Sequence, residues 1–143
     1  MTPPRSTPGW AVRLGVWLGV LLGVTALPAR AACGDTLPQP GRAVIAANGL
    51  QLAHAPTVWP LPVGEPFGLD IELCGTAAAL LQVEADMPAH RHGLNYRVQL
   101  RQTAPGRYRA DGLLLHMPGR WRLLFDLGPA QSPQRLVRSV DVD

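Results

Sequence analysis

The sequence contains no lysine, and charged residues make up only 16% of its 143 residues. Aromatic residues are also scarce, at 6%, whereas hydrophobic residues reach 47%. This balance excludes an intrinsically disordered chain. The sequence has no Walker-type loop and no GxGxxG, GxSxG or HExxH motif, which removes the usual nucleotide-binding and hydrolase signatures. Since no nucleophile stands in a recognisable arrangement with a base, we expect a protein that is not an enzyme, and we identify no small-molecule substrate.

The formal charge of +3 depends on arginines that we expect the mature protein to lose. Arg5 and Arg13 precede an apolar run from Leu14 to Leu27, and Ala29-Arg30-Ala31 follows as a cleavage site. This order is typical of a signal peptide. Without the three arginines of this segment, ten arginines equal ten acidic residues and the chain is formally neutral. A neutral chain argues against a nucleic-acid binder, which needs a basic face.

We therefore expect residues 1–31 to be a signal peptide and residues 32–143 to be one domain, periplasmic or secreted after cleavage near Ala31. The apolar run spans about 21 Å as a helix, less than the roughly 30 Å hydrocarbon core of a membrane. Two alternatives stay open. The segment is kept as an anchor, or the protein is a lipoprotein attached at Cys33, although Arg30 occupies a position where such proteins carry a bulky apolar residue.

The sequence has only two cysteines, Cys33 and Cys74. Exported proteins tend to pair their thiols, and a bridge here would close a loop of about 40 residues. The alternative is a redox or metal-binding thiol pair. Because the spacing is unlike C-x-x-C and neither cysteine is close to a histidine in the sequence, we predict a structural disulfide.

The rest of the chain is typical of short strands separated by glycine and proline. Asn48-Gly49 predicts a tight turn between strands at 42–47 and 50–54. Further strands show a period of two, which places one face of each in the core. The residues expected to point inward are Phe67, Leu69, Ile71 and Leu73; Leu81, Val83 and Ala85; Tyr96, Val98 and Leu100; Tyr108 and Ala110; and Trp121, Leu123, Phe125 and Leu127. With a last strand at 136–142, the pattern predicts an all-β fold, an antiparallel immunoglobulin-like β-sandwich of seven or eight strands. A small closed barrel is the alternative.

Three of the four histidines and both methionines of the mature chain fall in two segments between strands. The first contains Met87, His90 and His92, and the second contains His116 and Met117. Imidazole nitrogen suits copper, zinc and nickel, and thioether sulfur suits Cu(I) in particular. Neither segment has a cysteine, which argues against a blue-copper electron-transfer site. If the two segments meet at one end of the sandwich, these five side chains could bind copper.

The same residues also have structural interpretations. Met87 has the parity of the inward-facing residues before it, and Met117 could close the end of the sandwich. His116 could cap a turn, while His90 and His92 could be solvated near Asp86. His54 stands alone in an apolar stretch and is expected to be structural, and Trp121 and Phe125 are expected to anchor the core. The outward-facing arginines predict an exposed sheet face paired with carboxylates, or else a surface that docks a partner: Arg91, Arg97, Arg101, Arg107, Arg109, Arg120 and Arg122.

Three motifs together carry a resemblance to a known family. They are Met87-Pro-Ala-His90-Arg-His92-Gly93, then Gly106-Arg-Tyr108, then Gly112-Leu-Leu-Leu-His116-Met117-Pro118-Gly119-Arg-Trp121-Arg-Leu123. Over residues 65–143 the chain resembles the YtkA-like/FixH-like family of small exported or membrane-anchored immunoglobulin-like domains. The resemblance implies a role in copper handling or respiratory-oxidase assembly. Here Leu115-His116 precedes Met117, which adds a potential ligand to the family's pattern, and the membrane helix of FixH-like members has no retained counterpart if the signal peptide is cleaved.

Two functions are therefore expected. The first is a soluble exported accessory protein that binds copper through the Met/His segments, for copper handling or delivery to a redox enzyme. Its binding should weaken as the pH falls, because metal ligands must be unprotonated. The second is a metal-free module that docks onto an exported or membrane redox protein.

Overall fold

The computed structural model describes residues 1–2 and 31–143, so nearly all of the expected signal peptide lies outside the described residues. Within the described part, no helix combines the length and the apolar character needed to cross a membrane. The regular elements there are strands and one short 3-10 turn, with these bounds: β1 (Ala43–Ala47), β2 (Leu50–Pro56), β3 (Pro66–Cys74), β4 (Leu80–Met87), η1 (Pro88–His90), β5 (His92–Gly93), β6 (Gln99–Ala104), β7 (Arg107–Leu114), β8 (Gly119–Leu127) and β9 (Gln134–Val142).

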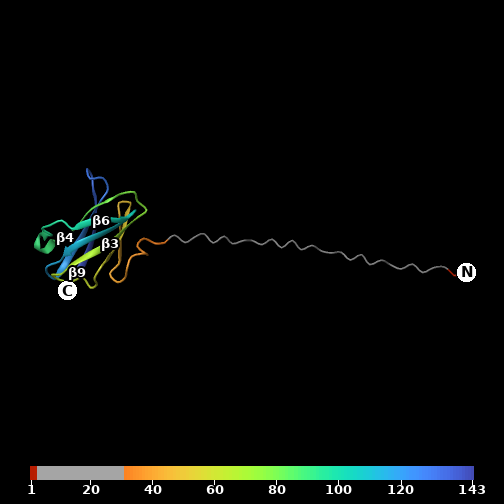
Figure 1. Cartoon of the computed structure of the whole chain (residues 1–143), viewed down its shortest axis with the longest axis horizontal. Coiled ribbons are helices and arrows are strands. Elements are labelled where there is room, and N and C mark those ends of the chain that lie inside the picture. Colours follow the sequence, from red (N-terminus) through yellow and green to blue (C-terminus); the bar gives the residue numbers. More distant parts are fainter. Residues whose placement is uncertain (3–30) are drawn as a thin grey trace.

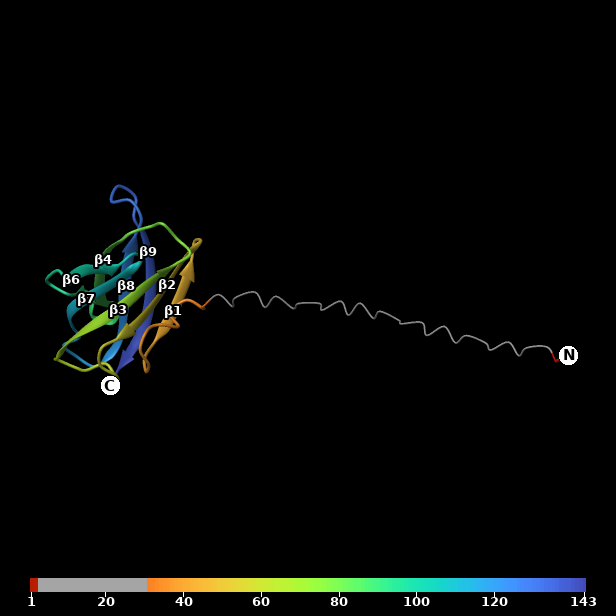
Figure 2. The same ribbon diagram turned by 45° about the vertical axis from the view of Figure 1, so that its right-hand side comes forward.

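The strands form two antiparallel sheets that pack face to face (Figures 1 and 2). One sheet has the order β1-β2-β3-β7-β6 and the other has the order β5-β4-β8-β9. In an immunoglobulin fold, strands A, B, E and D form one sheet and C, F and G the other, and β2-β3-β7-β6 and β4-β8-β9 take those places. The predicted immunoglobulin-like sandwich is confirmed. The closed barrel is wrong, because no strand of one sheet is hydrogen-bonded to a strand of the other within residues 31–143.

The alternation in the sequence accounts for the core. The inward residues of β3 and β8 are buried between the sheets, with Phe67 at 4% exposure and Trp121 and Phe125 at 0%. Fully burying a side chain of this size stabilises a fold by about 1.5–3 kcal/mol. The predicted turn at Asn48-Gly49 is also confirmed: both residues have positive φ, 54° and 75°, as a two-residue hairpin turn of right-handed twist requires.

Two inward assignments are wrong. Leu81 is exposed (38%) and Leu80 is buried instead (5%). The cause is a break in the register of β4 and β8 between Leu80 and Gln82, where one extra residue reverses the side that the preceding positions face. Tyr96 is 45% exposed because β6 begins only at Gln99, and its hydroxyl donates a hydrogen bond to the carbonyl oxygen of Gly112 at 2.7 Å.

The disulfide is confirmed. Cys33 and Cys74 are bonded, with their Cα atoms 5.7 Å apart. The bond attaches the segment before β1 to the end of β3, which is the central strand of the five-stranded sheet.

The arginines of the sheet faces pair with carboxylates, as expected. Arg109 donates to Asp70 at 2.7 Å and to Asp111 at 2.8 Å. Arg101, Arg107, Arg120 and Arg122 each lie within 4.0 Å of an Asp or Glu oxygen. Arg91 and Arg97 make no ion pair with a carboxylate of the described residues. Most of the positive charge of these faces is therefore neutralised within the sheet.

Candidate metal centre

The first histidine segment is the tight connection between β4 and β5. Met87 and His92 are paired across this hairpin, and η1 occupies the residues between them. Arg91 has φ 55°, which reverses the chain, and its amide donates to the carbonyl of Pro88 at 3.2 Å. A second bond, from the amide of Leu94 to the carbonyl of Ala85 at 3.1 Å, holds the far side of the hairpin. Backbone hydrogen bonds therefore fix the position of His90 and His92.

The pairing also decides where His92 points. Residues directly opposite one another in an antiparallel ladder lie on the same face, with Cβ atoms about 5 Å apart. Met87 faces the core at 3% exposure, so His92 turns toward the core as well. Its ring lies 5.6 Å from the indole of Trp121, between ring centroids. His92 is therefore partly buried.

The second segment joins β7 of the five-stranded sheet to β8 of the four-stranded sheet. Leu115 is fully buried and forms a bridge with Val63, which fixes the chain just before His116. Two residues of the turn are then held by Trp121, whose Nε1 donates to the carbonyl of Met117 at 3.0 Å. The rings of His116 and Trp121 meet edge to face at 5.3 Å. The indole of Trp121 is therefore the common support of both segments.

The two segments meet. The ring centroids of His92 and His116 lie 4.8 Å apart, and those of His90 and His92 lie 5.8 Å apart. His90 and His116 are exposed, whereas Nδ1 of His92 is buried and has no hydrogen-bond partner among the described residues. A buried polar atom without a partner costs about 1–3 kcal/mol. The predicted convergence of the loops is confirmed, and it leaves one ring nitrogen without a partner at its centre.

Open hollows flank the cluster on two sides. One, of about 480 Å³, is lined by Leu94, Tyr96, His92 and His116 among others, and a second, of about 450 Å³, is lined by Met87, Arg91 and His92 among others. His92 lines both of them. A solute or a partner side chain can therefore reach the imidazoles from either side of the hairpin.

Carboxylates take no part in the cluster. Asp86 is the nearest acidic residue in the sequence, and it accepts a hydrogen bond from Nε of Arg122 at 2.8 Å, with a second from the same guanidinium. As the side chains stand, no three His, Cys, Asp or Glu residues of the described ranges form a group that could hold a metal ion. Imidazole and thioether groups are therefore the candidate ligands that the two segments offer.

Each neighbouring pair of imidazole rings is spaced so that both could bind the same metal ion. A metal–nitrogen bond is about 2.0–2.1 Å, so two imidazoles on one ion have ring centroids about 4.5–6 Å apart for angles between 90° and nearly linear. Both measured separations fall in this range. Bringing all three ring nitrogens to one point requires rotation of the exposed His90 and His116 side chains, which a surface position permits.

The methionines stand at different depths. Met87 is buried, and a Cβ added at Gly119 would lie 2.5 Å from its Cε, so its thioether end lies against the start of β8. Met117 is half buried and packs against the core. The core interpretation of Met87 is thus confirmed, and the assignment of both sulfur atoms as metal ligands stays a prediction.

Comparison with known protein families, with curated proteins and with solved structures yields no match for this chain. The resemblance to the YtkA-like/FixH-like family accordingly stays a prediction.

Proposed function

We propose that this protein is an exported accessory protein that binds copper between its two histidine loops and hands it on. The observation that carries the proposal is the pair His92 and His116, 4.8 Å apart between ring centroids, contributed by two different loops around an unpartnered buried ring nitrogen. A metal ion at this position would satisfy that nitrogen.

The donor set favours copper over the other metals that imidazole binds. Zinc sites in proteins mostly add thiolate or carboxylate ligands, and neither is free here, since both cysteines are bonded and Asp86 is paired with Arg122. Imidazole with thioether suits Cu(I). Met87, directly across the ladder from His92, and Met117, next to His116, are the sulfur donors that the proposal names, with His90 as third imidazole.

The exposure of the cluster favours transfer over catalysis or storage. Two of the three imidazoles are exposed and the third borders two hollows, so a ligand from a partner could join the ion while the histidines leave. The disulfide is consistent with an oxidising compartment, where an exported or membrane redox protein would be the recipient.

Copper binding by the protein tests the proposal. We expect the purified protein, prepared without a metal-affinity tag, to bind one Cu(I) per chain under anaerobic conditions in competition with a chelator. The double variant His90→Ala with His92→Ala should lose this binding and keep the cooperative unfolding of the parent. Arg91→Gln is the matched control, because it alters the same loop and leaves every imidazole in place. Equal copper affinity of the double variant and the parent would refute the assignment.

The second candidate is a metal-free module that docks onto an exported or membrane redox protein. It is favoured by Tyr96, which is 45% exposed and lines a hollow beside Leu94, an arrangement suited to a partner's side chain. Protein that takes up neither Cu(I) nor Cu(II) on reconstitution would support this candidate over the first.

A further inference from the structure

The five-stranded sheet ends at β1, whose outer edge has no partner strand among the described residues (Figure 2). β1 pairs with β2 along its whole length, from Ala43 opposite His54 to Ala47 opposite Leu50. Its backbone makes no further hydrogen bond to the backbone of another segment within residues 31–143. An unpaired strand edge of this kind is a template to which another strand can add.

The turn after β1 decides which backbone groups point to the free edge. Ala47 and Leu50 flank a two-residue turn, so they form a hydrogen-bonded pair. In an antiparallel ladder such pairs alternate with pairs that exchange no hydrogen bond. The odd-numbered residues of β1 therefore direct their amides and carbonyls to β2, whereas Val44 and Ala46 direct theirs away from it. The free edge thus presents two donors and two acceptors.

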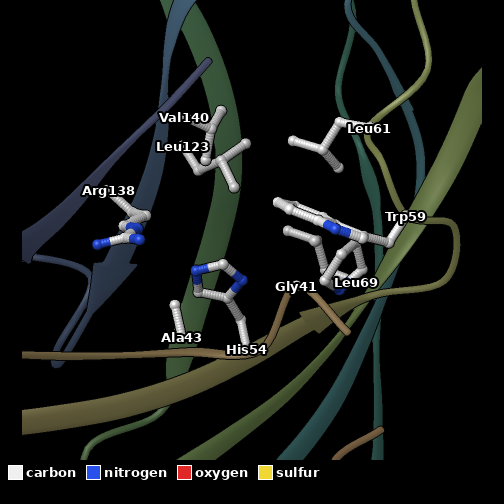
Figure 3. Close-up of a pocket in the computed structure, with 10 residues that line it drawn as sticks. Gly41, Ala43, His54, Trp59, Leu61, Leu69, Leu123, Arg138 and Val140 are labelled. Carbon is white, nitrogen blue, oxygen red and sulfur yellow. The ribbon is translucent and has the colours of Figure 1, made fainter. Parts of the chain in front are cut away.

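The side chains of β1 alternate between the two faces of the sheet. Ala43 lines a pocket between the sheets together with His54 of β2 and Val140 of β9, as Figure 3 shows. Ile45, two residues further on, packs against the core and is only partly buried. Val44 is on the outer face and is 45% exposed. A strand added at this edge would therefore meet apolar side chains on both faces.

The other edge strands of the described part are protected against pairing. β5 has only two residues, β6 carries Arg101 and breaks its register just before Ala104, and β9 carries three charged residues. Short length, charge and irregular register are devices that keep sheet edges from pairing. The sequence of β1, Ala-Val-Ile-Ala-Ala, has no charge and no proline, and its register is unbroken. This contrast singles out β1 as the edge that can accept a partner.

We propose that two copies of this chain pair through β1, antiparallel about a two-fold axis at Ile45, and so join their five-stranded sheets into one. A second copy fits because the free groups lie at positions 44 and 46, symmetrically on either side of Ile45. Val44 of one copy then exchanges two hydrogen bonds with Ala46 of the other, and the reverse pair does the same, so every free group of both edges is used.

The side chains agree with this register. The two Ile45 residues would be directly opposed on the inner face, with their Cα atoms about 4.5 Å apart, and each would cover the exposed part of the other. No charged residue lies in the paired segment, so joining identical strands brings no like charges together. The histidine loops lie on other strands, so the proposal is independent of copper binding.

Amide hydrogen exchange of the metal-free protein, measured by NMR at two concentrations, tests the proposal. A small interface of this kind should have a dissociation constant of about 100 μM. The amides of Val44 and Ala46 should then exchange about threefold more slowly at about 1 mM protein than at about 50 μM, because fewer chains are monomeric. The amide of Ile45 is bonded to β2 and should be protected equally at both concentrations. Exchange at Val44 and Ala46 that does not depend on concentration would overturn the proposal.

Variants of one exposed residue separate this edge from the rest of the surface. Val44→Lys adds a charge to the edge, and Val44→Pro removes a donor that the monomer does not use, so each should weaken the dimer at least about tenfold in sedimentation equilibrium. Both should keep the cooperative unfolding of the parent. Val137→Lys is the matched control, because Val137 is 43% exposed on the edge strand β9.

The dimer should persist in Val137→Lys with the affinity of the parent. A parent chain that is monomeric at about 1 mM would overturn the proposal, since an interface of the expected strength is mostly formed there. Dimers of the Val44 variants as tight as that of the parent would do the same, and so would an equal loss in Val137→Lys.

Discussion

The indole Nε1 of Trp121 and the carbonyl oxygen of Met117 are joined by a 3.0 Å hydrogen bond, and the same indole packs against the rings of both His92 and His116. A single core side chain thus connects the interior of the sandwich to the loops that carry the candidate site. This relationship makes Trp121 a positioning residue for the cluster, because it holds the loop and would not itself need to touch an ion.

Trp121→Phe should weaken both stability and copper binding. Phenylalanine keeps an aromatic core and loses the donor to Met117, which leaves a carbonyl without its partner and reduces the volume that fills the core. We expect the free energy of unfolding to fall by about 2–3 kcal/mol, measured by urea denaturation. Copper affinity should fall with it, since the loop that carries His116 is released. Phe125→Leu serves as a control, and an equal loss of copper affinity in this variant would contradict the positioning role.

Gly119→Ala should destabilise the protein through Met87. The glycine has φ 125°, a conformation that alanine rarely adopts, and the added Cβ would come 2.5 Å from Cε of Met87. We expect a loss of about 1–3 kcal/mol. A double-mutant cycle with Met87→Ala separates the two causes: if the clash matters, the combined loss is smaller than the sum of the single losses. Strict additivity would mean that backbone strain alone is responsible.

The buried His54 should make stability depend on pH. Its pKa in the folded protein is about 4, below the ordinary value of about 6.5 in the unfolded chain. The unfolded state therefore takes up a proton at a higher pH than the folded state does. Stability is fully present above about pH 6.5, falls as the pH drops from there to about 4, and loses about 2–4 kcal/mol over this interval. His54→Phe should abolish this part of the pH dependence in denaturation curves, and an unchanged profile would show that other groups cause it.

Removal of the disulfide should destabilise the fold and leave its strand order unchanged. The bond joins residues 41 apart in the sequence, and closing a loop of this length stabilises by about 4 kcal/mol through the entropy of the unfolded chain. Cys33→Ser combined with Cys74→Ser should lower the unfolding midpoint accordingly. The histidine loops connect β4 to β5 and β7 to β8, whereas the disulfide joins the segment before β1 to β3. The variant should therefore still bind copper at temperatures where it is folded. Loss of copper binding in the folded variant would link the cysteines to the site.

The fold could be predicted well wherever alternation and turn chemistry agree. In β3 and β8 every second residue is apolar and every inward residue is buried, and Asn48-Gly49 tolerates the positive φ angles of the turn observed. The failures occur where the alternation is interrupted. Leu80 and Leu81 are adjacent leucines, so the pattern allows either to face inward, and only the pairing of β4 with β8 decides. Tyr96 shares the alternation of Val98 and Leu100 in the sequence, but it lies in the loop before β6 and its side chain is exposed.

The candidate site could be predicted in its composition and in its convergence, since two histidine segments that follow strands of a sandwich can meet at one end. The role of Trp121 could not, because an inward tryptophan in a strand is indistinguishable from an ordinary core residue until its neighbours are known. The same holds for His54. A lone histidine in an apolar stretch indicates a structural residue, and only the structure shows that both of its ring nitrogens are buried without a hydrogen-bond partner among the described residues.

X-ray absorption at the copper edge of the Cu(I)-loaded protein tests the central claim most directly, because it counts the imidazoles bound to the ion. We expect at least two imidazole nitrogens at about 2.0 Å in the parent, and one fewer in His116→Ala as well as in His92→Ala, since each removes a ligand from a different loop. Copper that keeps the same imidazole count in His116→Ala would show that the ion binds to one loop only, and would contradict the account.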